Sequence, residues 1–479
     1  EIVGLPGGAV RESKDRVRAA IRNAGFEFPA RKITVNLAPA DIKKEGPAYD
    51  LPIALGVLVG SEQVPDSLGT GFVFLGELSL DGSVRSVHGV LPAVLAAAKS
   101  GFHRVVVPEA NAGEAALVDG VQVYPVKHIG QLLRFLAGED EIAPHRVNVD
   151  ALLGAGPDTG RDFTEVKGQA AAKRALEVAA AGGHNVLMLG APGSGKTMLA
   201  RCLPGILPDM DFNEALEVTT LYSLVGMLEP GQTLVTRRPF RAPHHTASTV
   251  ALVGGGRTPK PGEISLADHG VLFLDEFPEF RRDALEALRQ PLEDGVVAIT
   301  RIAGSSWFPA RIMLVAAMNP CPCGFFGDTR KECTCTPHQI QRYVSRVSGP
   351  LLDRMDIQIE VLRPDFKELG EGAGNPESPG IKERVEAGRR LQQERFGGGG
   401  TGFNGRMSGR DVRKHCRLTF EAKKLFKEAF RALELSARAH DRILKVSRTI
   451  ADLEGADTID SHHIGEAVQY RSLDRKYWR

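Results

Sequence analysis

The residues best suited to chemistry in this chain form a glycine-rich segment between an apolar run and a helical pattern. Residues 187–197 read Leu-Met-Leu-Gly-Ala-Pro-Gly-Ser-Gly-Lys-Thr, which is the spacing of a phosphate-binding loop. In such a loop backbone N–H groups surround an anion, the lysine charge meets the β- and γ-phosphates, and the hydroxyl serves Mg²⁺. The pattern predicts that a nucleoside triphosphate and Mg²⁺ are bound by Gly190, Ala191, Pro192, Gly193, Ser194, Gly195, Lys196, Thr197 and Met198.

Two carboxylates end a second apolar run. Residues 271–274 predict a buried strand, and Asp275 and Glu276 follow it directly. A strand beside the phosphate loop would place Asp275 where it can hold Mg²⁺ through water, together with Thr197. It would also place Glu276 where it can polarise the attacking water.

Asn319 ends a third apolar run, residues 312–318. Its amide could orient the water near the γ-phosphate, or the residue could merely start the turn that Pro320 requires. Gln169 precedes the first helical pattern of this region, and we expect it to lie against the nucleotide base.

Two arginines are expected to act on the phosphates from outside the loop. Arg354 lies in a short segment, residues 351–356, and suits a finger that reaches the γ-phosphate of a neighbouring subunit. An ion pair with Asp353 or Asp356 is the alternative. Arg448 lies on a predicted helix near the C-terminus that could fold over the nucleotide, and Arg442 competes for that role.

The elements that must position these residues divide the chain into predicted domains. The boundaries are an α/β domain over 1–138, a linker over 139–160, a nucleotide-binding core over 161–364, a Gly/Pro-rich linker over 365–380 and a mainly helical region over 381–479. In the front domain, strands are predicted at 32–37, 71–76 and 104–107. The best helical patterns of the last region are 420–435 and 437–453.

Length and composition exclude several classes of protein. The 479 residues are too many for one compact core, and 42% hydrophobic and 25% charged residues are ordinary values for a globular protein. The net charge of +1 hides a basic C-terminal region, since residues 381–479 hold 22 Lys+Arg and 14 Asp+Glu. Such a region suits contact with nucleic acid, and it suits solvated helix faces equally well.

Membrane and secretory signals are absent from the sequence given. No run of 18 apolar residues and no signal peptide is found, and six cysteines, four of them within 321–335, do not resemble a secreted disulfide framework. We therefore expect a cytoplasmic protein without a membrane span. Because Glu1 is not Met and opens into an apolar pattern, we expect the native N-terminus to be missing, which leaves a leader possible.

The motifs, in this order, resemble those of the AAA+ ATPases. Residues 296–301, a turn at Gly304 and residues 307–311 resemble the extra β-hairpin of the branch that contains magnesium chelatases and replicative helicases. In that branch hairpins point into the pore of a hexamer, so Arg301 and the tip at 303–306 are candidates for contact with a threaded substrate. An ordinary surface hairpin is the alternative.

Longer stretches resemble one family of that branch. Residues 237–279, 316–324 and 340–356, and the front segment at 2–21, are similar to the ComM (YifB) family of magnesium-chelatase-related proteins. The resemblance implies a bacterial, ATP-driven hexameric DNA motor, a branch-migration helicase in homologous recombination or natural transformation. Its cofactors would be ATP and Mg²⁺, and its partners single-stranded or branched DNA. A magnesium-chelatase motor subunit and an unfoldase without peptidase activity are the alternatives.

The front domain resembles the proteolytic domain of Lon. Lon-type peptidases use a serine and, one helix later, a lysine, but the matching positions here are Ala48 and Leu91. Without a hydroxyl and a base there is no acyl-enzyme route. We therefore expect a peptidase-dead domain reused for assembly or DNA binding. The full fold class implied is α/β, with this Lon-protease-like domain, a central AAA+ core with a parallel sheet and inserted β-hairpins, and a C-terminal helical lid.

Four cysteines lie close together in the sequence. They form two C-x-C pairs that could hold a structural Zn²⁺ in a tetrahedral site: Cys321, Cys323, Cys333 and Cys335. Because C-x-C is tighter than the usual C-x₂-C, free thiols or a disulfide formed on oxidation are equally open. His338 is either a spare ligand or a surface residue. The adjacent pair His244 and His245 has no role that the sequence assigns.

Overall fold

The computed structural model describes residues 1–65, 69–154, 161–256, 258–301, 304–328, 330–363, 377–397, 402–433 and 435–473. The chain divides into two compact units. The first comprises Glu1–Gly156, Asp211–Thr236 and Arg301–Gly304, and the second Pro157–Met210, Arg237–Thr300 and Ser305–Arg479. Parts of both predicted linkers, 155–160 and 365–376, and residue 303 of the predicted hairpin tip lie outside the described residues.

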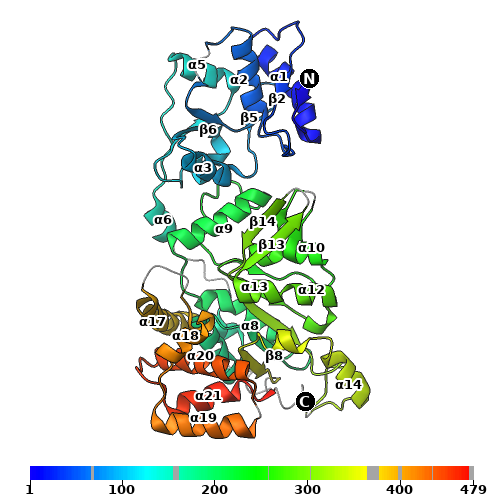
Figure 1. The fold of residues 1–479 in the computed structure, drawn as a ribbon, viewed down its shortest axis with the longest axis vertical. Coiled ribbons are helices and arrows are strands. Elements are labelled where there is room, and N and C mark those ends of the chain that lie inside the picture. The colour runs from blue at the N-terminus through cyan, green and yellow to red at the C-terminus, as the bar shows by residue number, and fades with distance from the viewer. Residues whose placement is uncertain are drawn as a thin grey trace. The chain divides into compact units, whose positions relative to one another are not determined.

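The first unit is an α/β fold around a short parallel sheet (Figure 1). Its strands pair in the order β3 (Phe72–Phe74), β6 (Arg104–Pro108) and β7 (Gln122–Val126). Two smaller strand pairs join β1 (Ile2–Val3) to β2 (Val35–Asn36) and β4 (Glu77–Leu78) to β5 (Val84–Arg85). The helices are α1 (Gly8–Asn23), α2 (Asp50–Gly60), α3 (Val90–Lys99), η2 (Glu109–Asn111), α4 (Ala112–Ala115), α5 (Ile129–Ala137), α6 (Val149–Gly154) and α9 (Phe212–Val225). Buried side chains of α1, α2 and α5 form the core with β6 and β7.

Helix α9 belongs to the first unit, although its residues lie in the middle of the predicted nucleotide-binding region of the sequence. It packs on α3, and the Gly89 N–H donates to the Ser223 carbonyl at 2.8 Å. Gly226 ends the helix at φ 73°, and a Cβ there would lie 2.1 Å from the His88 ring, so only glycine fits this close approach. Residues 211–236 of the predicted core, 161–364, therefore pack with the front domain instead.

The second unit is built on a five-stranded parallel sheet. The strand order is β16 (Ile357–Glu360), β8 (Val186–Leu189), β15 (Met313–Met318), β12 (Val271–Leu274) and β9 (Phe240–Arg241). Every residue of β8, β12 and β15 is buried, as expected for strands covered on both faces. Because all strands run the same way, the segments that follow β8, β12 and β15 meet at one edge of the sheet.

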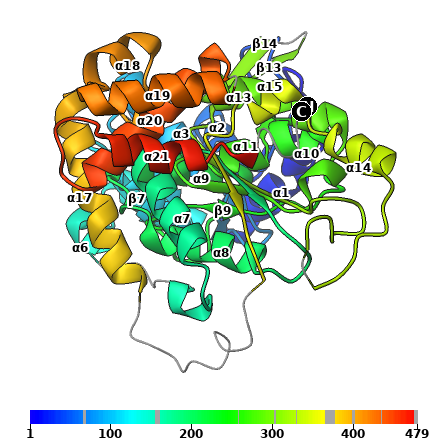
Figure 2. The same cartoon turned by 90° about the horizontal axis from the view of Figure 1, so that it is seen from below.

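Helices pack on this sheet and on one another. Helix α7 (Ala170–Gly182) contacts β16, and both α17 (Ser378–Phe396) and α20 (Ala437–Leu453) pack on α7. Helices α19 (Phe420–Ala432), α20 and α21 (Ser461–Gln469) lie side by side in both views (Figures 1 and 2). The Asp162 carboxylate accepts the N–H groups of Glu377 and Ser378, each at 3.1 Å, and so ties the start of α17 to the sheet domain.

The other elements of the second unit are short. The helices are η3 (Phe163–Glu165), α8 (Lys196–Cys202), η4 (Leu203–Ile206), α10 (Thr249–Val253), α11 (Glu263–Leu266), η5 (Phe277–Glu279), α12 (Arg282–Ala287), α13 (Arg289–Asp294), α14 (Pro337–Val344), α15 (Gly349–Leu352), η6 (Asn404–Arg406) and α18 (Gly409–His415). Strands β10 (Gly254–Gly255) and β11 (Lys260–Pro261) form one pair, and β13 (Val296–Arg301) and β14 (Gly304–Pro309) form the predicted hairpin.

The predicted fold class is confirmed. The chain is α/β, with a five-stranded parallel sheet in its central region and a helical C-terminal region. Among the helices of the described ranges, none combines the length and the apolar character that crossing a membrane requires.

Candidate nucleotide site

The phosphate loop joins the buried strand β8 to helix α8. Gly193 and Gly195 have φ angles of 76° and 92°, a region that side chains with a Cβ avoid. Gly190 is needed for a different reason, because a Cβ there would lie 2.3 Å from the Val361 carbonyl oxygen. The loop therefore has the backbone freedom and the close packing that its glycines predict.

Lys196 is buried at the base of this loop. Its Nζ donates to the Gly190 carbonyl at 2.6 Å, to the Ala191 carbonyl at 3.1 Å and to Asn319 Oδ1 at 3.3 Å. Burial lowers the pKa of Lys196 to about 8, and the charge of Arg363 adds to that effect. A bound anion would favour the charged form of this ammonium group and so raise its pKa.

The predicted magnesium residues meet in the structure. Thr197 Oγ1 donates to Asp275 Oδ2 at 2.7 Å, and the other oxygen, Asp275 Oδ1, accepts the Glu276 N–H at 2.9 Å. A hydroxyl and a carboxylate at this spacing are the hard oxygen donors that Mg²⁺ takes alongside phosphate and water. The residues present therefore fit the ion.

A cavity of about 520 Å³ collects these side chains. Its lining is Arg161, Pro192, Gly193, Ser194, Gly195, Lys196, Thr197, Met198, Arg201, Asp275, Glu276, Met318 and Asn319. Gln169 does not line this cavity, but its Nε2 donates to the Ser194 carbonyl at 3.5 Å. Sequence reasoning missed Arg161 and Arg201, which are not part of any local motif.

His245 is one of the two histidines to which the sequence assigned no role. Its Nδ1 lies 2.8 Å from Glu276 Oε2, and the His244 ring lies 4.1 Å from the His245 ring at an angle of 35°. The two adjacent rings therefore lie close together, in the loop that follows β9. His245 holds one oxygen of the predicted catalytic carboxylate.

We expect the change His245→Ala to lower the rate of ATP turnover about tenfold and to leave the KM for ATP unchanged, because the Glu276 carboxylate loses a positioning contact but no phosphate contact is removed. Steady-state ATPase kinetics measure both values. His338→Ala, an exposed histidine away from the cavity, serves as the control. A turnover that stays at the wild-type value would show that the contact has no catalytic consequence.

Arg354 lines a second cavity, of about 600 Å³, in the same unit. Its guanidinium donates to the Pro350 carbonyl at 2.7 Å and pairs with Glu293. The alternative ion pairs considered for Arg354 are not formed, because Asp356 pairs with Arg442 and Asp353 lies 3.6 Å from Arg438. Three further cations line the cavity with Arg354 and Arg442: Arg406, Arg438 and Lys445.

Arg448 does not lie at either cavity. It is 1% exposed, and its guanidinium donates to Asp452 Oδ1 at 3.0 Å, to the Asp457 carbonyl at 2.8 Å and to the Ala456 carbonyl. Asp452 also accepts two bonds from Arg395. The donors of Arg448 therefore serve buried acceptors within the helical region, and the predicted contact with phosphate would have to break these bonds. Its competitor Arg442 is the one that faces a cavity.

The remaining residues predicted for a functional site lie on the hairpin and in the cysteine cluster. On the hairpin, Arg301 is exposed and Trp307 is 66% exposed, although tryptophan is usually covered.

The four predicted cysteine ligands have their sulfur atoms within 4.8 Å of one another. His338 is exposed and does not belong to this group.

Comparisons with known proteins agree with this geometry. Three family profiles match, "Magnesium chelatase, subunit ChlI" over 162–369, "Subunit ChlI of Mg-chelatase" over 1–111 and "Magnesium chelatase, subunit ChlI C-terminal" over 375–471. Competence protein ComM of Haemophilus influenzae is 47% identical over 477 residues, 99% of this chain and 92% of that protein. The chain belongs to the ComM/YifB family of magnesium-chelatase-related AAA+ ATPases. The family protein YifB of Escherichia coli is 44% identical over 475 residues, 99% of this chain and 92% of that protein.

Membership of the ComM/YifB family indicates nucleotide binding, ATPase activity with ATP and Mg²⁺, and formation of oligomers. The likeness of the front unit to Lon is also found, since Lon protease 2 of Bacillus subtilis is 29% identical over 123 residues, 25% of this chain and 22% of that protein. At the two Lon positions, Leu91 is fully buried and Ala48 precedes α2 with its carbonyl accepting the Gly76 N–H at 3.1 Å. Neither side chain can act as nucleophile or base.

Proposed function

We propose that this chain is an ATP-driven DNA motor that works as a ring of six identical subunits in the bacterial cytoplasm. Its activity would be branch migration of DNA in homologous recombination or natural transformation. The name of the Haemophilus influenzae relative, competence protein, supports the second process. The cations around Arg354 are the observation that carries the proposal.

These cations line a cavity separate from the phosphate loop of their own chain. Arg354 and Lys445 belong to it, but five carboxylates line it as well, so a bound phosphate would have to replace Glu293 as the partner of Arg354. No phosphate-binding loop lines this cavity in the described part of the chain. A triphosphate held on the loop of an adjacent subunit would supply the anion, which is how an arginine finger in trans works. ATP turnover then requires neighbouring subunits and hence a ring.

Within one subunit the other residues have distinct tasks. The phosphate loop and Lys196 bind the β- and γ-phosphates, and Thr197 and Asp275 would hold Mg²⁺, which neutralises phosphate charge when bound. Glu276 accepts the proton of the attacking water, and Asn319 orients that water. Lys196 therefore serves the binding of ATP, and Glu276 serves proton transfer during its hydrolysis.

The DNA contact is proposed for the hairpin β13–β14. An exposed Trp307 offers a stacking surface for bases, and Arg301 offers a charge for the phosphate backbone. The basic C-terminal region adds charge of the same sign. A magnesium-chelatase motor subunit or an unfoldase would use the same ATPase site but would need no stacking residue on this hairpin.

A strand-displacement assay on forked and four-way DNA tests the proposal. The wild type should move branches only with ATP, and DNA should stimulate its ATPase activity. The Glu276→Gln variant should bind ATP but turn it over about 10²–10⁴-fold more slowly, because an amide cannot accept the proton of water, and branch movement should stop with it. ATP turnover that DNA does not stimulate would favour the chelatase or unfoldase alternatives.

A further inference from the structure

A long loop without secondary structure separates β15 from α14. Residues 319–336 include no helix or strand among those described, although loops of this length are uncommon in compact domains. Few of its side chains are buried and could fix its position. Cys321 is buried, but Phe325 and Phe326 are not. Such a segment needs another source of order.

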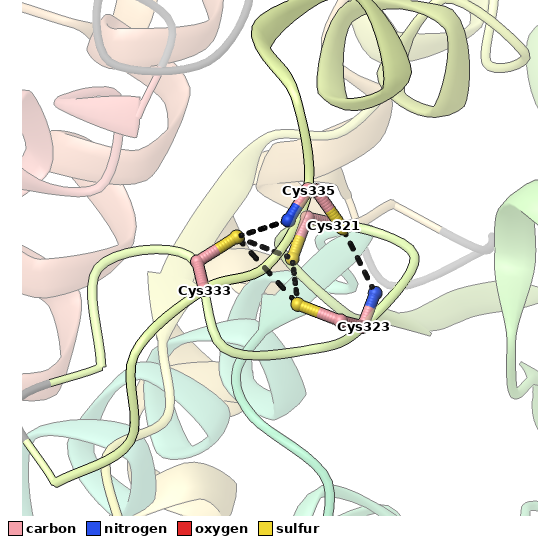
Figure 3. Close-up of side chains that lie close together, drawn as sticks. All are labelled: Cys321, Cys323, Cys333 and Cys335. Atoms are coloured by element: carbon pink, nitrogen blue, oxygen red, sulfur yellow. Dashed lines mark hydrogen bonds between the residues drawn. The ribbon is translucent and has the colours of Figure 1, made fainter.

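The four cysteine side chains converge at the centre of this loop (Figure 3). The Cys321 sulfur lies 3.3 Å from that of Cys323 and 3.7 Å from that of Cys333, and the Cys323 and Cys333 sulfurs are 3.5 Å apart. Four sulfur ligands about 2.3 Å from a tetrahedral Zn²⁺ would lie about 3.8 Å from one another. A disulfide would need about 2.05 Å between two sulfurs. The spacing therefore suits a metal.

Backbone N–H groups point at three of these sulfurs. The Phe326 N–H donates to Cys321 Sγ at 3.3 Å, the Cys323 N–H to Cys335 Sγ at 3.4 Å and the Cys335 N–H to Cys333 Sγ at 3.4 Å. Such bonds stabilise thiolates around a metal and fix their direction. Four cysteine ligands leave no open coordination position, so the ion would be structural.

The same loop lies directly on the phosphate loop. A Cβ on Gly324 would lie 2.5 Å from Pro192 Cδ, and Gly324 has a φ of 86°. From the other side, Arg363 donates to the Pro192 carbonyl at 3.1 Å, and its guanidinium lies 5.3 Å from the Phe325 ring centre. Cys321 also follows Asn319, the partner of Lys196, by two residues. The position of the cysteine loop therefore limits the position of the phosphate loop.

We propose that Cys321, Cys323, Cys333 and Cys335 bind one structural Zn²⁺, and that this ion holds residues 320–328 and 330–336 against the phosphate loop, so that the affinity for ATP depends on the metal. The first half of the proposal, that the four cysteines bind zinc, rests on the cysteine geometry alone. The second half rests on the proposed function, because it takes the loop to be the ATP site.

Metal analysis of the purified full chain tests the first half. We expect one zinc per chain and none in the double variant Cys333→Ser/Cys335→Ser, whereas Cys416→Ala, a cysteine outside the cluster, keeps its zinc. All six thiols should be free after denaturation in a chelator. A chain that neither contains zinc nor takes it up, or that has fewer free thiols, would overturn the proposal.

Binding of a fluorescent ATP analogue tests the second half. Removal of zinc should weaken binding about tenfold to a hundredfold, because the phosphate loop shifts, and returning zinc to the same sample should restore it. Gly324→Ala should keep one zinc per chain but bind ATP more weakly, because its Cβ would press on Pro192. If zinc-free protein or Gly324→Ala binds ATP as the wild type does, the coupling is wrong.

The Lys196→Ala variant separates the two proposals. It should keep its zinc while losing ATP binding. A wild-type chain that holds zinc but binds no ATP would refute the proposed function and leave the metal site in place.

Discussion

Replacing Lys196 with alanine is expected to remove measurable ATP binding and, with it, all ATP turnover. The ammonium group is buried and bonds to Asn319 and to carbonyls of the loop itself, whereas Arg161 and Arg201, the other cations of the cavity, are exposed. Loss of one partner from a buried charge pair costs about 3–5 kcal/mol, which is roughly a hundredfold or more in the dissociation constant. Titration with a fluorescent ATP analogue measures the effect.

The pH dependence of binding gives a second signature of the same residue. Burial lowers the pKa of Lys196 to about 8, so the free protein loses this charge as the pH rises through that value. Bound phosphate favours the charged form, and binding above pH 8 must therefore take up a proton. We expect ATP affinity in the wild type to fall about tenfold per pH unit above that point.

Two controls make the Lys196 result specific. The exposed Lys423→Ala on α19 should bind ATP as the wild type does. The Lys196→Ala variant should keep its thermal unfolding midpoint, and any residual ATP binding at high ligand concentration should not depend on pH near 8. ATP binding by Lys196→Ala with wild-type affinity would mean that the loop does not hold the triphosphate.

Replacing Arg354 with alanine should lower ATP turnover by about 10³-fold, the effect of removing an arginine finger, without changing the ATP affinity of a single subunit. The physical reason is that Arg354 lines a cavity apart from the phosphate loop of its own chain. ATPase rates and equilibrium binding, measured on the same sample, separate the two effects. Arg410→Ala, an exposed arginine on α18, is the matched control.

Mixing two inactive variants tests whether Arg354 acts between subunits. A Lys196→Ala subunit keeps its Arg354, and an Arg354→Ala subunit keeps its phosphate loop. When the two variants are neighbours in a ring, the phosphate loop of the Arg354→Ala subunit and the Arg354 of the Lys196→Ala subunit together form one complete ATPase site. We expect turnover to recover on mixing, and continued inactivity of a mixture that does assemble would contradict a role in trans.

Local patterns predicted the elements that carry the site. The helix expected at 437–453 is α20, Ala437–Leu453, and the buried strands before the phosphate loop, Asp275 and Asn319 are β8, β12 and β15. These elements follow from apolar runs and helical spacing, which a linear sequence displays. The strand expected at 32–37 is shorter, only Val35–Asn36, because a two-stranded pair covers little of it.

Partner choice among polar side chains could not be predicted in this way. Arg442 and Arg448 lie on the same helix, yet one pairs with Asp356 at a cavity and the other with Asp452 in the interior. The sequence shows five residues between them but not which buried carboxylate each will neutralise. His245 is a similar case, since its contact with Glu276 spans two separate elements.

The sequence by itself predicted a triphosphate site, because a phosphate loop needs only a strand, a few glycines, a lysine and a helix in succession. It also determined the family, through motifs that are contiguous in the chain. Only the tertiary structure decided that α9 packs with the front unit, that Arg442 and not Arg448 faces a cavity, and that four cysteines gather in a loop whose Gly324 contacts Pro192. These contacts join residues far apart in the chain, and burial and charge pairing select them only once the chain has folded.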